Sequence, residues 1–289
     1  FNGMEVPGLD PDRNTLQLDI LPTNLIDNII VKKSYSADLP ADFTGGIVDV
    51  KLKSFSESPK YSISYSVGYN PDMHLNDNFI KDQNSDTDWL GYDNGLRDNN
   101  VYFEDYDNQS INNDEIIKNT RKLNNNFGVV NAVSDVNYSL SMTASNSYGL
   151  SKDLNDNRRI GYIAAIGYKN ETTFNQNFYR GTTILEDQIL QDFSSISGDE
   201  GIQNRFLSGL FGLSYRGKKS TYTANFLYLQ NGQSTAIDAL YKEYIENPYT
   251  AIGNTILYNE RNLKSIPVAA KYILRAVSYT HLRAHETVM

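Results

Sequence analysis

The sequence predicts a mainly β fold of antiparallel strands, and three observations support this. Several stretches alternate between apolar and small polar side chains; at 61–69, for example, Tyr, Ile and Val alternate with Ser and Gly. The intervening stretches are rich in Asn, Asp, Gly and Ser, which favour turns. No run of 18 or more apolar residues occurs, so the sequence predicts no membrane-spanning helix.

Composition narrows the classes of function. The 289 residues include no Cys, which excludes a disulfide framework and Cys-ligated metals. The formal net charge of −9 makes a nucleic-acid partner held through phosphate neutralisation unfavourable, so none is expected. The region 71–126 holds twelve acidic and five basic residues and carries a net charge of −7. The acidity is therefore concentrated in one segment.

The first 53 residues predict a small mixed unit. We expect strands at 1–6, 29–33 and 47–53, a loop at 7–14 and a helical turn at 22–28 that starts near Pro22. The adjacent Gly45 and Gly46 indicate a backbone with positive φ or a close approach of another chain; an ordinary turn before a strand is the alternative. A unit this small needs a surrounding structure to bury its apolar side chains.

From residue 60 the pattern changes to six longer strands, expected at 61–69, 135–148, 160–168, 206–215, 221–229 and 266–274. Their connections alternate between long and short, with the long ones at 71–126, 181–201 and 231–253 and the short ones at 150–157 and 216–219. Long loops on one side and tight turns on the other are typical of outer-membrane barrels.

Two further features favour a membrane β-barrel over a soluble β-sandwich. The polar faces consist of Ser, Thr, Asn and Gly, with few of the Lys and Glu side chains that cover a solvated sheet. The apolar faces begin and end with Tyr. Tyr61 and Tyr69 are eight residues apart, roughly 26 Å at about 3.3 Å per residue. A tilt of about 40° reduces this to roughly 20 Å, close to the apolar band of about 25 Å between aromatic girdles.

Three N-terminal motifs resemble the plug domain of TonB-dependent outer-membrane receptors. Phe-Asn-Gly-Met-Glu-Val at 1–6 is similar to the plug strand Leu/Ile-Asp/Asn-Gly-x-x-Val. Pro-Thr-Asn-Leu-Ile-Asp-Asn-Ile-Ile-Val-Lys-Lys at 22–33 resembles Pro-x-x-Leu/Ile-Ile-Glu-x-Ile-Glu-Val-x-Lys/Arg, with Asp27 and Asn28 near positions where Glu is common. Phe-Thr-Gly-Gly-Ile-Val-Asp-Val-Lys-Leu-Lys at 43–53 is similar to the ending of the plug.

The resemblance implies a transporter in the outer membrane and not an enzyme. Residues 1–55 would be the C-terminal part of the plug, and 56–275 the first strands of an incomplete barrel of twenty-two strands. It implies energised import of a scarce solute, with membrane lipid and a TonB-type energiser as partners and a surface lipoprotein as a candidate partner. The energiser would act through a segment upstream of Phe1. The loop 71–126 would be extracellular. A passive pore or adhesion barrel, and a soluble β-sandwich carbohydrate-binding or enzyme domain, are the alternatives.

The same resemblance places the solute between the outer loops and the upper apices of the plug. It implies that Asp10, Asp12 and Arg13 face the ligand; an internal ion pair of Arg13 with one of these aspartates is the alternative. In the acidic loop, Trp89 and Tyr92 supply aromatic surface for stacking on a sugar or a planar ligand, or for packing within the loop.

The acidic loop also contains a weak calcium pattern. Asp82, Asn84, Asp86, Asp88 and Asp93 stand at positions 1, 3, 5, 7 and 12 of an EF-hand count. Thr87 replaces the required Gly at position 6, and position 12 is Asp instead of Glu. A solvated loop is the alternative, and no metal or other cofactor is expected.

No catalytic constellation is expected, because His74 has no nucleophile at a recognisable spacing and no phosphate-binding glycine loop precedes a helix. The tail 276–289 resembles a translated sequencing adapter, and we expect it to lie outside the native fold. Its His281 and His285 have the spacing of zinc ligands on a helix, so this exclusion matters. A genuine start of a seventh strand is the alternative.

Overall fold

The computed structural model describes residues 25–36, 39, 45–52, 55–83, 85–98, 113–123, 128–151, 157–186, 189–245 and 248–273, and the backbone of 279–288. Its main feature is an antiparallel sheet of seven strands in the order β11-β10-β9-β8-β7-β6-β3. These strands are β3 (Lys60–Gly68), β6 (Asn137–Gly149), β7 (Arg159–Glu186), β8 (Ile189–Arg216), β9 (Ser220–Glu243), β10 (Tyr249–Ile273) and β11 (Tyr279–Val288). The predicted mainly β, antiparallel fold is confirmed.

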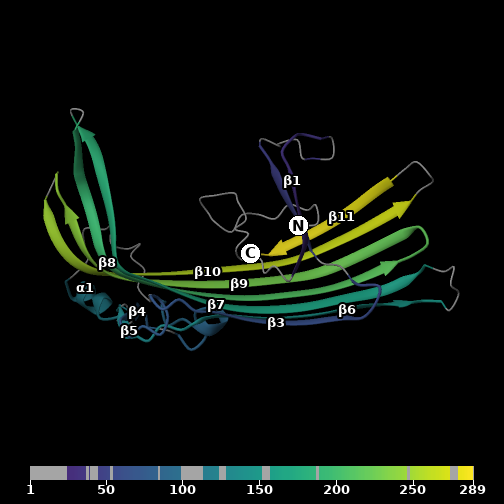
Figure 1. Cartoon of the computed structure of the whole chain (residues 1–289), viewed down its shortest axis with the longest axis horizontal. Coiled ribbons are helices and arrows are strands. Elements are labelled where there is room, and N and C mark those ends of the chain that lie inside the picture. Colours follow the sequence, from purple (N-terminus) through teal and green to yellow (C-terminus); the bar gives the residue numbers. More distant parts are fainter. Residues whose placement is uncertain are drawn as a thin grey trace.

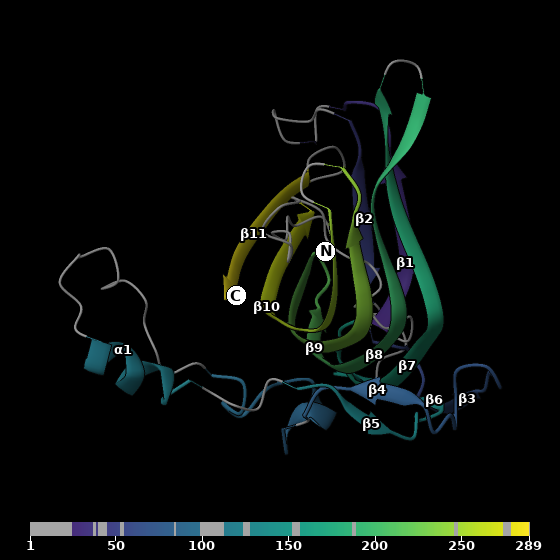
Figure 2. The same ribbon diagram turned by 90° about the vertical axis from the view of Figure 1, so that its left-hand side faces the viewer.

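Smaller elements lie on the two sides of this sheet. Strands β1 (Ile26–Lys32) and β2 (Ile47–Leu52) form an antiparallel pair, as do β4 (Phe79–Lys81) and β5 (Val130–Ala132). A short 3₁₀ helix, η3 (Asp88–Leu90), and the helix α1 (Asn113–Thr120) complete the described elements. The large sheet is strongly bowed: β1 and β2 lie within its concave side, and β4 and β5 lie on its convex side (Figures 1 and 2).

The convex face carries an exposed apolar band. On β3 the side chains of Tyr61, Ile63, Tyr65 and Val67 are 55–74% exposed. They pair with Ala144, Met142, Leu140 and Tyr138 of β6, so the apolar side chains of neighbouring strands share one face. The band continues across the sheet through exposed residues of β7 to β10, namely Ile160, Ile166, Phe211, Leu213, Tyr222, Phe226, Ile266 and Val268.

The opposite face is built differently at the edge and at the centre of the sheet. At the edge it is lined by hydroxyls, as predicted: Ser62, Ser64 and Ser66 pair with residues of β6, and the hydroxyls of Ser66 and Ser139 are 2.8 Å apart. At the centre this face is apolar, and there it packs against β1 and β2. The buried cluster comprises Leu25, Val50 and Leu52 from the N-terminal part, and Ile163, Ala165, Phe206, Leu210, Leu227, Leu229 and Leu263 from the sheet.

Several predicted boundaries were wrong. The stretches 181–201 and 231–253 were expected to be long loops but are mostly strand. Strand β7 continues to Glu186 and β8 begins at Ile189; likewise, β9 continues to Glu243 and β10 begins at Tyr249. In the outer parts of these strands, apolar residues such as Leu185 and Ile252 stand among polar ones without regular alternation, although the hydrogen-bonded ladder continues. The helical turn expected at 22–28 is also wrong over 26–28, which belong to β1.

The C-terminal tail forms a strand in this structure. The backbone of β11 pairs antiparallel with β10, from Lys264 opposite Val288 to Ile273 opposite Tyr279. The tail expected to lie outside the fold therefore extends the sheet. His281 and His285 stand on a strand, where a separation of four residues spans roughly 13 Å and does not give the helical zinc spacing.

Candidate functional site

The first long connection of the sheet folds back onto the convex face. We call residues 70–83 and 85–98 of this connection the covering segment. Its backbone approaches two glycines of the sheet: a Cβ on Gly201 would collide with the carbonyl of Ile80, and a Cβ on Gly232 would lie 2.6 Å from the carbonyl oxygen of Gly91. Glycine is required at both positions because only a missing side chain allows two backbones to come this close.

Arg97 anchors the covering segment. Its guanidinium donates hydrogen bonds to three carboxylates: Asp82 at 2.6 and 2.9 Å, Asp88 at 2.6 and 2.7 Å, and Asp93 at 2.7 Å. The four side chains are only 2–14% exposed. The pairing with Asp88 is bidentate, which is the strongest geometry available to an Arg and a carboxylate.

Further contacts join this cluster to the sheet. The Arg97 guanidinium lies over the ring of Tyr258 of β10, 4.1 Å from its centroid. The backbone N–H of Asp93 donates to Glu260 at 3.1 Å, and Gln230 of β9 donates to the carbonyl of Gly91 at 2.6 Å. Residues separated by 139 and 167 positions in the chain are thereby brought together.

The electrostatics of the cluster are those of a tight ion pair. Burial alone would lower the pKa of Arg97, but the hydrogen bonds and charges of Asp88 and Asp82 raise it above its ordinary value. Burial would likewise raise the pKa of Asp93; the backbone N–H groups of Arg97 and Gly95 and the guanidinium overcome this and lower it. Arg97 is therefore a permanent cation, and Asp93 is ionised at neutral pH.

Three of the five residues of the calcium pattern meet at Arg97 instead of surrounding an open position. Asp86 is exposed, and Asn84 lies outside the described residues. Among the described residues, no group of three or more His, Asp or Glu side chains is arranged to hold a metal ion. Calcium binding stays a prediction. The Arg97 guanidinium already neutralises the carboxylates that a calcium ion would need.

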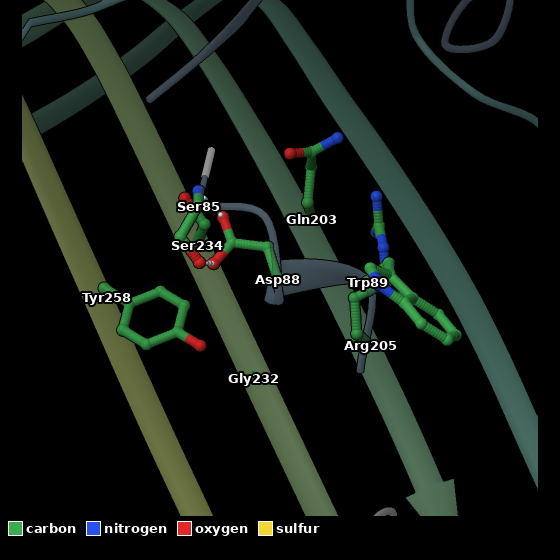
Figure 3. Close-up of a pocket in the computed structure, with 8 residues that line it drawn as sticks. All are labelled: Ser85, Asp88, Trp89, Gln203, Arg205, Gly232, Ser234 and Tyr258. Atoms are coloured by element: carbon green, nitrogen blue, oxygen red, sulfur yellow. Dashed lines mark hydrogen bonds between the residues drawn. The ribbon is translucent and has the colours of Figure 1, made fainter. Parts of the chain in front are cut away.

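A hollow of about 120 Å³ lies between the covering segment and the sheet. Figure 3 shows Trp89 and Arg205 at one end and Ser85, Asp88, Ser234 and Tyr258 at the other, with Gln203 above them. Trp89 belongs to η3, and its side chain is 59% exposed. The end of η3 is fixed by the hydrogen bond from the Gly91 N–H to the Asp88 carbonyl at 2.9 Å. Gly91 has a φ of 83°, a left-handed conformation that suits glycine.

The structure distributes the other predicted residues as follows. Tyr92 is in the covering segment and 37% exposed, but it does not line the hollow. Asp10, Asp12 and Arg13 lie outside the described residues. The glycine pair does not show the predicted constraint: a Cβ would meet open space at Gly45 and only an ordinary contact, 3.5 Å from the Lys32 carbonyl oxygen, at Gly46.

His74 has a structural role. Its Nδ1 accepts the backbone N–H of Asn70 at 2.8 Å, so the proton is on Nε2, which donates to the carbonyl of Thr172 at 3.1 Å. The ring is 3% exposed. Nδ1 thus closes a turn within the covering segment, and Nε2 ties that segment to β7.

Sequence reasoning missed Gln203, Arg205, Ser234 and Tyr258, which line the hollow from three strands. A glycine inside a strand indicates a close backbone approach, but Gly201 and Gly232 fell in stretches expected to be loops, so this signal could not be read. Arg97, four residues after Asp93, was also present as an internal partner for the acidic loop.

Comparison of this chain with protein-family models, with curated proteins and with solved structures found no match. No helix among the described residues is long and apolar enough to cross a membrane.

Proposed function

We propose that this chain belongs to a TonB-dependent outer-membrane transporter, with 1–55 as the end of the plug and 56–275 as the first part of the barrel wall. The observation that carries the proposal is the difference between the two faces of the large sheet. Its convex face exposes a broad apolar band, with Ile63 74% and Ile166 59% exposed, whereas its concave face packs on β1 and β2. A barrel wall with lipid outside and a plug inside requires this arrangement.

The rows of tyrosine support the same proposal. Tyr61 at one end of β3 and Tyr69 just beyond its other end are 71% and 59% exposed. Tyr215, Tyr222 and Tyr272 cluster on three neighbouring strands, with ring centroids 6.1 and 5.5 Å apart along the row. Aromatic side chains with an apolar ring and a polar hydroxyl favour the boundary between lipid and water.

The packing of β1 and β2 against the wall identifies the contacts that would have to break during import. Leu25 is fully buried, and Val50 and Leu52 nearly so, against the wall. A path for a solute would open only when the plug rearranges and these contacts loosen. Asp10, Asp12 and Arg13 are the residues proposed to meet the solute. Trp89 and Tyr92 belong to a segment on the opposite face of the wall, so we do not assign them to that site.

Two measurements on the full-length protein test the proposal. In fractionated source cells, the protein is expected in the outer-membrane fraction, with the covering segment accessible to protease added to intact cells. Recovery as a monodisperse monomer without detergent would instead favour a soluble domain.

The second measurement separates a plugged transporter from a passive pore. In planar lipid bilayers, the purified full-length protein is expected to give no steady ion conductance, because the plug fills the barrel. Deletion of 1–55 within the full-length protein is expected to produce open channels. Steady conductance of the unaltered protein would contradict energised transport and favour a pore.

A further inference from the structure

The hollow on the convex face is lined by polar groups that lack partners. Gln203 and Ser234 are only 8% and 7% exposed, and within the described part of the chain neither side chain makes a hydrogen bond. The hydroxyl of Tyr258 is buried and also has no partner there. The polar atoms of Gln203 and Ser234 are open to the hollow, whereas the Tyr258 hydroxyl is not. Polar groups of folded proteins are nearly always hydrogen-bonded, so the free amide and hydroxyl on the wall of this hollow indicate a position for an external ligand.

The charged groups around the hollow are already paired. The carboxylate of Asp88 accepts two bonds from Ser85 and two from Arg97. Arg205 lies 3.7 Å from Asp135 and donates to the carbonyl of Asn204 at 3.4 Å. The accessible free groups are therefore the amide of Gln203 and the hydroxyl of Ser234, which can both donate and accept but carry no charge. A metal ion would find no unpaired carboxylate at Asp88.

An indole face completes this chemistry. Trp89 is exposed at the mouth of the hollow although its backbone is fixed at both ends of η3 by Ser85 and Gly91. The face of an indole ring carries partial negative charge and attracts weakly positive C–H groups. A sugar ring offers such C–H groups on one face and hydroxyls around its edge.

We propose that the hollow binds the edge of a sugar ring, with the ring stacked on Trp89 and its hydroxyls bonded to Gln203 and Ser234. The volume of about 120 Å³ admits the hydroxyl-bearing edge of one ring, or about four water molecules at roughly 30 Å³ each. The sugar comes either from the headgroup of a glycolipid or from a free glycan.

The position of the hollow bears on the source of the sugar. Gln203 and Arg205 share the face of β8 that carries the exposed Phe211 and Leu213, and no register shift interrupts the pairing of β8 with β9 between 194 and 216. Arg205 is six residues, or roughly 20 Å, along the strand from Phe211. If the proposed function holds, this site faces the headgroup layer and lies off the import path. The binding of sugar itself does not depend on that function.

The test uses the full-length protein in detergent micelles with two probes. The first is a rough-type lipopolysaccharide, whose binding is counted by native mass spectrometry. The second is the core oligosaccharide released from it by mild acid, followed by saturation-transfer NMR. Trp89→Ala and Gln203→Leu are each expected to weaken binding about tenfold, because each removes one contact of about 1 kcal/mol or slightly more. The matched controls are Tyr179→Ala, an exposed aromatic on β7, and Gln233→Leu, on the concave face of β9.

Thermal unfolding separates a lost contact from a damaged fold. Gln203→Leu is expected to leave the unfolding midpoint unchanged or higher, because it removes a buried amide without a partner. Binding of lipopolysaccharide alone supports a glycolipid site, and binding of both probes supports a general saccharide site. Failure to bind either probe, or equal binding by the site variants and the controls, would overturn the proposal and leave a hollow filled by water only.

Discussion

Replacing Arg97 by Met is expected to release the covering segment from the sheet. The substitution keeps an unbranched side chain of similar length and removes the only cation that bonds to Asp82, Asp88 and Asp93 in the described structure. Three carboxylates that are 2–14% exposed would then face one another without a counter-charge. They would either separate into solvent or take up protons.

The free-energy cost of Arg97→Met follows from the burial of Arg97 and its three carboxylate partners. Removing one partner of a buried ion pair costs about 3–5 kcal/mol, much of it from the charge left behind. At about 1.4 kcal/mol per factor of ten, the opening equilibrium of the segment should rise more than about a hundredfold. The loss is local, because the buried cluster beneath β1 and β2 makes no use of Arg97.

Hydrogen–deuterium exchange of the full-length protein in detergent measures this opening directly. Peptides covering 79–98 are expected to exchange faster by at least that factor or to become fully unprotected, whereas peptides from the centre of β8 should not change. Arg216→Met is the control, since its pair with Glu57 is 43% and 72% exposed and contributes about 0–1 kcal/mol.

A charge-matched variant completes the design. Combining Arg97→Met with Asn at 82, 88 and 93 removes the repulsion and should restore part of the protection. Unchanged exchange over 79–98 in Arg97→Met would refute the assignment of Arg97 as the anchor of the segment. If Arg216→Met increased exchange over 79–98 as much as Arg97→Met, the argument that a buried ion pair stabilises the segment more than an exposed one would be refuted.

Four further outcomes are expected. Because the pKa of Asp93 is lowered from 3.8, its contribution is complete at neutral pH and is lost as pH falls below about 4, so rate-corrected exchange over 79–98 should rise only in acid. Gly232→Val should displace the covering segment at a cost of about 1–3 kcal/mol, seen in the same peptides, since even a Cβ would lie 2.6 Å from Gly91. Leu263→Ala should lower the thermal midpoint through a loss of about 2–5 kcal/mol in the buried cluster. From the proposed barrel wall it follows that Ile63→Arg should reduce assembly into lipid vesicles through a cost of about 2–4 kcal/mol at mid-membrane, whereas Ser64→Arg, on the other face, should assemble normally.

The strands could be predicted wherever one face meets a different environment from the other. Strand β3 reads correctly from sequence because Tyr61, Ile63 and Tyr65 share one face and Ser62 and Ser64 the other. The outer halves of β7 to β10 could not be found in this way. There the ladder contains polar pairs, such as Thr182 with Ser194, and apolar pairs, such as Leu185 with Leu190, so the residues show no regular alternation.

The candidate site could be predicted only in part. Trp89 and the acidic residues near it were identifiable because their types are unusual within one short segment. Their partners Gln203, Ser234 and Tyr258 are ordinary residues more than a hundred positions away, and the register of three strands alone brings them together. Local spacing carries no information about such a register.

The charges of the covering segment bear on the weak calcium pattern in its sequence. Acidic residues at alternate positions predict ligands for calcium when each carboxylate is free, but Arg97 occupies the point where Asp82, Asp88 and Asp93 converge. A guanidinium with a raised pKa stays charged at every physiological pH. The segment thus carries its own cation, and the presentation of Trp89 beside the hollow does not depend on the concentration of a free ion.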